Sequence, residues 1–238
     1  IGIFFDSHHL SMSAEIFNNS IDNYIFNQKL QSQFGGDSIY VEAGNNYPVY
    51  KFRQTKEQLF GGEERIDINT HPLDWLHFEN SISLVYAINK GGNGAVINDS
   101  NKYLPFIPPL HTNSELRAEL PKKVSCFHHT YFKIGMQYYA SQNRVLLENN
   151  TETQTPGYTL FDAGFGTDIC TKKEVTLCTI GIFVTNLTDV AYQSNMSRLK
   201  YFDSYPNNGT GRSGIFSMGR NVSFKLTIPL NVNLNKKK

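Results

Sequence analysis

The sequence predicts an all-β, antiparallel up-and-down fold, and two observations support this. Apolar and polar residues alternate with a period of two in many segments, whereas the spacing typical of amphipathic helices is scarce. The segments are joined alternately by tight turns and by long polar loops rich in Gly, Asn and Pro. This strict alternation places all short turns at one end of the sheet and all long loops at the other.

The first half of the chain contains one partial strand and four full strands. Residues 1–5 ("IGIFF") resemble the middle of a strand. In residues 10–16, 60–68 and 75–89 the even positions are mostly apolar, so each segment presents one apolar face. Residues 114–120 ("SELRAEL") continue the series.

The second half contributes four further strands, at residues 131–142, 158–169, 176–186 and 222–234. The last of them, "VSFKLTIPLNVNL", alternates over its whole length, because every even position is apolar. Pro229 cannot donate a hydrogen bond to a neighbouring strand, so it suits a strand end. We therefore expect eight full strands after the partial one.

The links fall into two groups. Tight turns are predicted at 70–74, 120–123 and 170–174, and long loops at about 27–48, 89–103, 143–156 and 190–218.

Two environments fit strands with one apolar face. In a soluble β-sandwich that face is buried between two sheets, and in a transmembrane barrel it meets lipid while the other face lines a wet lumen. Segments 75–89 and 175–186 are long enough to cross a membrane, which takes about 9–11 tilted residues. Tyr and Trp also gather near strand ends, at Trp75, Tyr138, Tyr139, Tyr158 and Tyr192, as in an interfacial girdle.

The polar faces favour the barrel, because a wet lumen accepts the charged and amide residues in the middle of these strands. They are Glu15, His77, Glu79, Lys133, Gln137 and Lys225. In this register Val222, Phe224, Leu226 and Ile228 face lipid, and Ser223, Lys225 and Thr227 face the lumen. The alternative that remains is a soluble secreted β-sandwich that binds a ligand or carbohydrate.

Composition excludes several classes of protein. A net charge of +1 offers no strong attraction to polyanions, so no nucleic-acid partner is expected. Three cysteines, an odd number at uninformative spacing, do not indicate a disulfide framework. No run of about 18 apolar residues predicts a transmembrane helix, and no signal peptide is visible. The lysines of 236–238 belong to a polar, basic tail over residues 231–238.

No motif predicts catalysis, a metal or a cofactor. Cys126, His128 and His129 are close in sequence, but adjacent residues of a strand point to opposite faces. The group of His71, Asp74 and His77 lacks a signalled nucleophile. The Gly-rich stretches 91–94 and 207–214 lack the Lys-Ser or Lys-Thr and the helix of a phosphate-binding loop.

Three stretches resemble TonB-dependent outer-membrane receptors. Residues 184–230 contain "NLTDVAY" and then "GR" at the start of the last strand, as at the end of that family's barrel. Residues 104–120 resemble its Leu-Pro-x-x-Pro-x-His approach to a descending strand. Residues 58–87 resemble its Gly-x-Glu strand, short turn and next strand. The motifs occur in the family's order.

The resemblance implies a barrel of about 22 strands whose lumen holds an N-terminal plug. Residues 1–230 would form about the last eight strands, with the plug absent from this chain. The function implied is import across the outer membrane of a Gram-negative bacterium, without enzymatic activity. Ligands of the family include iron–siderophores, haem, cobalamin and glycans. The plug and the TonB complex would act as partners only in the full-length receptor, and lipid would surround the barrel.

Ligand contacts are expected on the long loops, because loops on a rigid scaffold carry function and Tyr and Arg suit recognition. The residues predicted to contact the imported small ligand are Tyr40, Tyr47, Tyr103, Arg144, Arg198, Tyr201, Tyr205 and Arg212.

Overall fold

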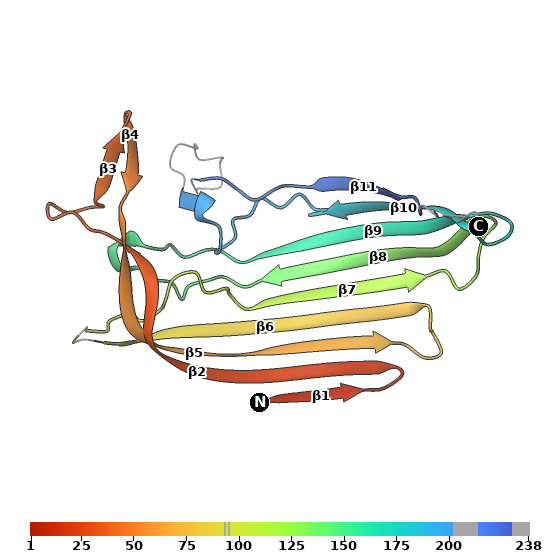
Figure 1. Cartoon of the computed structure of the whole chain (residues 1–238), viewed down its shortest axis with the longest axis horizontal. Helices are drawn as coiled ribbons and strands as arrows, with labels where there is room; N and C mark the ends of the chain where they lie inside the picture. Colours follow the sequence, from red (N-terminus) through yellow and green to blue (C-terminus); the bar gives the residue numbers. More distant parts are fainter. Residues whose placement is uncertain (93, 95, 202–213, 230–238) are drawn as a thin grey trace, which may run out of the picture.

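A single antiparallel sheet dominates the computed structural model, which describes residues 1–92, 94, 96–201 and 214–229 (Figure 1). Its nine strands follow the order β1-β2-β5-β6-β7-β8-β9-β10-β11, and a hairpin, β3-β4, forms a second small sheet. The strands are β1 (Gly2–Asp6), β2 (Leu10–Lys29), β3 (Ile39–Glu42), β4 (Asn45–Pro48), β5 (Tyr50–Asn69), β6 (Leu76–Gly91), β7 (His111–Glu119), β8 (Phe127–Tyr139), β9 (Tyr158–Cys170), β10 (Thr176–Thr185) and β11 (Asn221–Thr227). Two short 3₁₀ helices are η1 (Glu148–Asn150) and η2 (Arg198–Tyr201).

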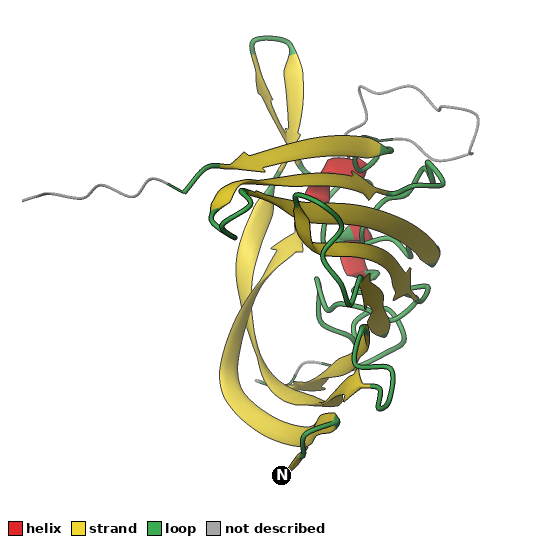
Figure 2. Ribbon diagram, turned by 90° about the vertical axis from the view of Figure 1, so that its right-hand side faces the viewer, coloured by secondary structure: helices red, strands yellow, loops and turns green. Residues whose placement is uncertain are grey.

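The nine predicted strands are confirmed, and so is the arrangement of their links. Tight turns join the strands at one end of the sheet, and the long loops gather at the other end (Figure 1). We refer to these as the turn end and the loop end. The sandwich alternative is wrong, because the strands form one continuous sheet rather than two facing sheets. Figure 2 shows that this sheet is strongly curved. Within the described residues, no helix is long and apolar enough to cross a membrane.

Two segment predictions were wrong. The loop expected at 27–48 contains the β3-β4 hairpin, and β2 and β5 each continue to 20 residues beside it. Alternation of apolar and polar residues reveals only the part of a strand that has an apolar environment on one side. The polar extension of β2 and β5 lacks this pattern and was therefore not predicted. The last strand, expected over 222–234, ends at Thr227, before Pro229. Residues 230–234 of that expectation lie outside the described residues.

The pairing register gives the sheet two chemically distinct faces. One row of directly paired residues is entirely apolar: Phe78, Leu116, Ile134, Ala163, Val184 and Val222, from β6 to β11. The row one residue further along is largely polar: His77, Arg117, Lys133, Gly164, Phe183 and Ser223. The apolar face is uncovered, with Ile134 at 62% and Phe224 at 66% exposure. The predicted register of the last strand is confirmed, since Lys225 lies on the polar face opposite Gly181.

The tightest packing lies in the loops rather than against the sheet. Leu104, Val145 and Leu146 are at most 1% exposed, and all three belong to loops at the loop end. A soluble domain would bury the apolar face of its sheet. Here the loops have their own small core, and the apolar face of the strands stays open.

Candidate functional site

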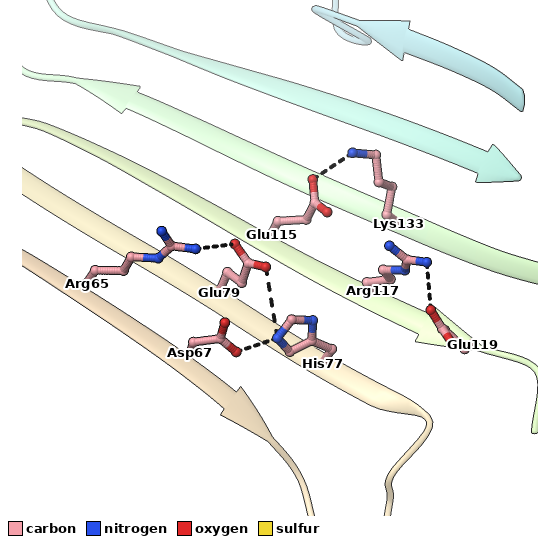
Figure 3. Close-up of polar contacts among 8 residues, drawn as sticks. All are labelled: Arg65, Asp67, His77, Glu79, Glu115, Arg117, Glu119 and Lys133. Atoms are coloured by element: carbon pink, nitrogen blue, oxygen red, sulfur yellow. Dashed lines mark hydrogen bonds and ion pairs between the residues drawn. The ribbon is translucent and has the colours of Figure 1, made fainter. Parts of the chain in front are cut away.

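The polar face of β5 and β6 carries a chain of ion pairs near the turn end (Figure 3). His77 Nε2 contacts Asp67 Oδ1 and lies 3.9 Å from Glu79 Oε1. The guanidinium of Arg65 lies 3.5 Å from the other oxygen of Glu79. The register explains this grouping, because Asp67 pairs directly with Glu79 across the two strands.

The same face continues with ion pairs on β7 and β8 (Figure 3). Lys133 Nζ donates to Glu115 at 2.8 Å, and Arg117 lies 2.6 Å from Glu119 on its own strand. Arg117 also stacks over the ring of Tyr131 at 4.0 Å. These side chains are 31–45% exposed, so each pair contributes little to stability, about 0–1 kcal/mol. Their arrangement fits a water-facing wall.

A row of stacked rings crosses the polar face at the loop end. His111 stacks on Tyr139 at 5.5 Å, Tyr139 on Tyr158 at 4.8 Å, and Tyr158 packs against Tyr192 at 4.4 Å. We expected Tyr139, Tyr158 and Tyr192 in a membrane girdle. That is wrong for this row, because Tyr139 shares its face with Lys133. Tyr138 points to the opposite, apolar face, as a girdle residue should, and is 39% exposed.

Also at the loop end, buried polar groups join the long loops to one another. The carboxylate of Glu152 accepts hydrogen bonds from the backbone N–H of Phe106 at 2.9 Å and of Leu146 at 3.3 Å. Lys200 Nζ donates to Thr155 Oγ1 at 2.9 Å and to Asn195 Oδ1 at 3.2 Å. These bonds connect the loop before β7, the loop after β8 and the loop after β10, so the three are held in one arrangement.

Burial shifts the pKa values of the ionisable groups in this loop network. Glu152 is 2% exposed and Lys200 is 7% exposed. Burial raises the pKa of the Glu152 carboxyl, and the two backbone donors and Lys200 partly offset that rise. Burial lowers the pKa of the Lys200 amine, and Glu152 partly offsets that fall. Tyr201, whose hydroxyl accepts a bond from Thr153 N at 3.1 Å, has a pKa raised chiefly by burial.

Four of the residues predicted to bind ligand lie in or beside this loop network, namely Tyr103, Arg144, Arg198 and Tyr201, which is described above. Arg144 stacks over Tyr86 at 4.1 Å, and its buried Nε has no hydrogen-bond partner among the described residues. Arg198 stacks over the ring of Phe106 at 4.6 Å. Tyr103 pairs with Ile88 of β6 through a single β-bridge. The guanidinium groups of both arginines are therefore already stacked on aromatic rings of the protein.

Of the other four predicted residues, two lie in the β3-β4 hairpin and two fall outside the described residues. Tyr40 and Tyr47 pair directly across the β3-β4 hairpin and are 58% and 48% exposed. The hairpin rises from the loop end of the sheet as a separate small projection (Figure 1). Tyr205 and Arg212 lie outside the described residues.

The histidines that are close in sequence, at 71 and 77 and at 128 and 129, do not form joint sites among the described residues. His71 Nδ1 lies 3.3 Å from Asp74 Oδ1 in the turn after β5, whereas His77 contacts Asp67 and Glu79 on the polar face. His129 Nδ1 lies 3.0 Å from Asp168 Oδ2, and Cys126 is a free thiol.

Sequence reasoning missed the ring row and the Glu152–Lys200 network. His111, Tyr139 and Tyr158 pair with one another because of the register between neighbouring strands. Alternation within each strand does not determine that register. Glu152 and Lys200 lie in different loops and had no local signal. A charged residue in an otherwise polar loop looks solvated until the loops are packed together.

Comparison with known proteins supports this architecture. Residues 1–187 match the family described as TonB dependent receptor-like, beta-barrel. None of the curated proteins matches the sequence significantly. The structure superposes on that of the copper transporter OprC with a TM-score of 0.69, 15% sequence identity and 95% of this chain covered. For the FrpB iron transporter from Neisseria meningitidis the TM-score is 0.62, with 10% identity and 95% coverage.

The ferric citrate transporter FecA is a third similar structure, with a TM-score of 0.60, 14% identity and 95% of this chain covered. This chain spans only 29–30% of the length of these three proteins. Identities this low show a shared fold alone.

Proposed function

This chain belongs to the TonB-dependent receptor β-barrel family, and we propose that it forms part of the wall of an outer-membrane importer of a metal complex. The observation that carries the proposal is the pair of adjacent rows across β6 to β11. One row is apolar and uncovered, and the next carries His77, Arg117 and Lys133. A membrane-spanning barrel requires lipid-facing and lumen-facing residues to alternate in this way.

In this proposal the apolar face meets the lipid of the outer membrane of a Gram-negative bacterium. The ion pairs of Figure 3 line the lumen, near the periplasmic end where the short turns lie. The long loops face the outside, because short periplasmic turns and longer extracellular loops are the rule in such barrels. A plug and the TonB complex act as partners when the barrel is complete.

A metal complex is the ligand class that we favour among those the family imports. Each of the three similar structures described above is named as a transporter of copper, iron or ferric citrate. The ring row and the loop network offer planar and cationic surfaces that suit a chelate. The residues of this chain that we propose for ligand contact remain Tyr40, Tyr47, Tyr103, Arg144, Arg198, Tyr201, Tyr205 and Arg212.

Deleting the gene that encodes this chain tests the proposal in its own host. We expect the deletion to abolish uptake of one radiolabelled iron or copper chelate from a panel, and inactivating TonB to have the same effect. The protein should be recovered with the outer-membrane fraction. Recovery from the soluble fraction, or unchanged uptake of every chelate in the panel, would contradict the proposal.

A further inference from the structure

Two tight turns lie side by side at the turn end of the sheet. One follows β1 and contains His9, and the other follows β5 and contains His71 and Asp74. The backbone connects them, because Asn69 N donates to His9 O at 2.9 Å, next to the direct pairing of Leu10 with Ile68. The two turns are therefore held in a fixed relation by the strand register.

Three metal-binding side chains converge where these turns meet. The rings of His9 and His71 stack with centroids 4.9 Å apart and planes at 28°. His71 Nδ1 lies 3.3 Å from Asp74 Oδ1. One ligand atom from each of the three residues lies within 4.8 Å of the others. In addition, the ring of His8 meets that of His9 edge-on at 4.6 Å.

From this geometry we propose that His9, His71 and Asp74 bind a divalent transition-metal ion, with Zn²⁺ as the reference ion. Two imidazoles and one carboxylate are a ligand set that zinc accepts, leaving a fourth position for water or another side chain. Bonds of about 2.0–2.1 Å in a tetrahedron place ligand atoms about 3.3 Å apart. His71 and Asp74 already have that spacing.

The remaining adjustment is small and falls on exposed side chains. The side chains of His71 and Asp74 are 63% and 76% exposed, so their rotation meets little resistance. An open groove lined by Asp74, Trp75 and Glu119 borders the turn and leaves it accessible to an ion. The main chain of the turn is held by Thr70, whose Oγ1 lies 2.9 Å from Leu73 O and 3.0 Å from Leu76 O and can donate its hydrogen to either.

A second group of possible ligands, Asp67, His77 and Glu79, is a weaker candidate. It offers one imidazole, and the Arg65 guanidinium already lies 3.5 Å from Glu79 (Figure 3). A bound dication would be repelled by that fixed positive charge. Among the described residues, Asp74 has an ion-pair contact only with His71.

This site goes beyond the proposed import function, because it lies at the opposite end of the sheet from the long loops. A metal there would bridge the turn after β1 to the turn after β5. It would stabilise the folded sheet, since an ion that binds the folded state alone shifts unfolding by mass action.

Calorimetric titration with Zn²⁺ of the untagged, detergent-solubilised receptor that carries this chain tests the site. We expect one saturable site. His9→Gln, His71→Gln and Asp74→Asn should each weaken binding by about tenfold or more, in line with the loss of one of three protein ligands. His111→Gln and Asp99→Asn are matched controls, because they remove an imidazole and a carboxylate at the opposite, loop end of the sheet and should leave the affinity unchanged.

Zinc X-ray absorption gives a second readout that does not depend on affinity. Two imidazoles are expected in the first coordination sphere of the wild type, and one in His71→Gln. Far-UV circular dichroism identifies the samples that retain their strand content, and only these are compared. Absence of saturable binding by folded wild type, or equal weakening by the control substitutions, would overturn the proposal.

Discussion

At the scale of single residues, buried polar groups determine how the loops are arranged. Glu152 and Lys200 come from different loops and have little access to water. Burying a charge is costly unless hydrogen bonds compensate it. Here the compensation for Glu152 comes from the backbone N–H groups of Phe106 and Leu146. For Lys200 it comes from the side-chain oxygens of Thr155 and Asn195, so both buried groups report on the packing of the loop layer.

Replacing Glu152 by Ala removes the acceptor of two backbone donors, Phe106 N–H and Leu146 N–H. A buried donor left unsatisfied costs about 1–3 kcal/mol. Amide exchange at Phe106 and Leu146 should accelerate by about tenfold or more, measured by hydrogen–deuterium exchange with mass spectrometry. Glu174→Ala in the turn after β9 is the control, because it removes only a surface ion pair with Lys123. Unchanged exchange in the Glu152 variant would contradict the network.

The raised pKa of Glu152 predicts a pH dependence of stability. Because the folded loop holds the Glu152 proton more tightly than the unfolded chain does, this contribution is fully present below the ordinary pKa of 4.5. It is lost as pH rises through the raised value. The melting temperature of the wild type should therefore fall relative to Glu152→Gln between about pH 4 and pH 7. A rise over that range would show that the carboxylate is stabilised rather than disfavoured by its surroundings.

At the scale of elements, close cross-strand packing fixes the polar face. A Cβ added at Gly166 of β9 would lie 2.4 Å from Cε1 of Tyr131 on β8. The same ring carries the guanidinium of Arg117 at 4.0 Å. Gly166, Tyr131 and Arg117 thus form three layers on neighbouring strands, and the middle ring needs the space that glycine leaves.

Gly166→Ala should destabilise the sheet by about 1–3 kcal/mol, because the Tyr131 ring must move out of its contact with Arg117. Gly135→Ala is the matched control on β8, since its Cβ would meet Asp162 Cβ at an ordinary 3.5 Å. Thermal unfolding followed by circular dichroism compares the two. Equal melting temperatures would show that Tyr131 moves aside without cost.

The strands show how much of the fold could be predicted from the sequence. Alternation located all nine strands of the main sheet and the two kinds of link, because one face of each strand has an apolar environment. It failed for the β3-β4 hairpin and for the halves of β2 and β5 nearest the loop end. In these segments the two faces of the strand no longer differ in polarity. Alternation correctly placed Lys225 on the polar face, opposite Gly181.

The candidate site was less predictable than the fold. Tyr and Arg residues of the loops were selected by type, and the structure shows Arg144 and Arg198 stacked on Tyr86 and Phe106. Other groups that converge, such as His9 with His71, come from segments far apart in sequence. Only the register of the strands between them brings such residues together.

At the scale of the whole molecule, the sheet has two open edges and one uncovered apolar face. β1 and β11 lie at the edges, and Ile3, Ile16 and Phe224 of the apolar face are each more than 60% exposed. In water, such a surface with free strand edges would promote aggregation. Lipid and further barrel strands would cover both in the importer that we propose. This agrees with a chain that spans about 30% of the length of its structural neighbours.

In the importer that we propose, adjacent residues of a strand face lipid and lumen in turn. Single cysteines at 223, 224, 225 and 226, in the receptor with Cys126, Cys170 and Cys178 replaced by Ser, can carry nitroxide labels in the outer membrane. Accessibility to oxygen reports lipid, and accessibility to a water-soluble nickel chelate reports the lumen. We expect oxygen access at 224 and 226 and chelate access at 223 and 225. Uniform access at all four positions, or the reverse order, would contradict it.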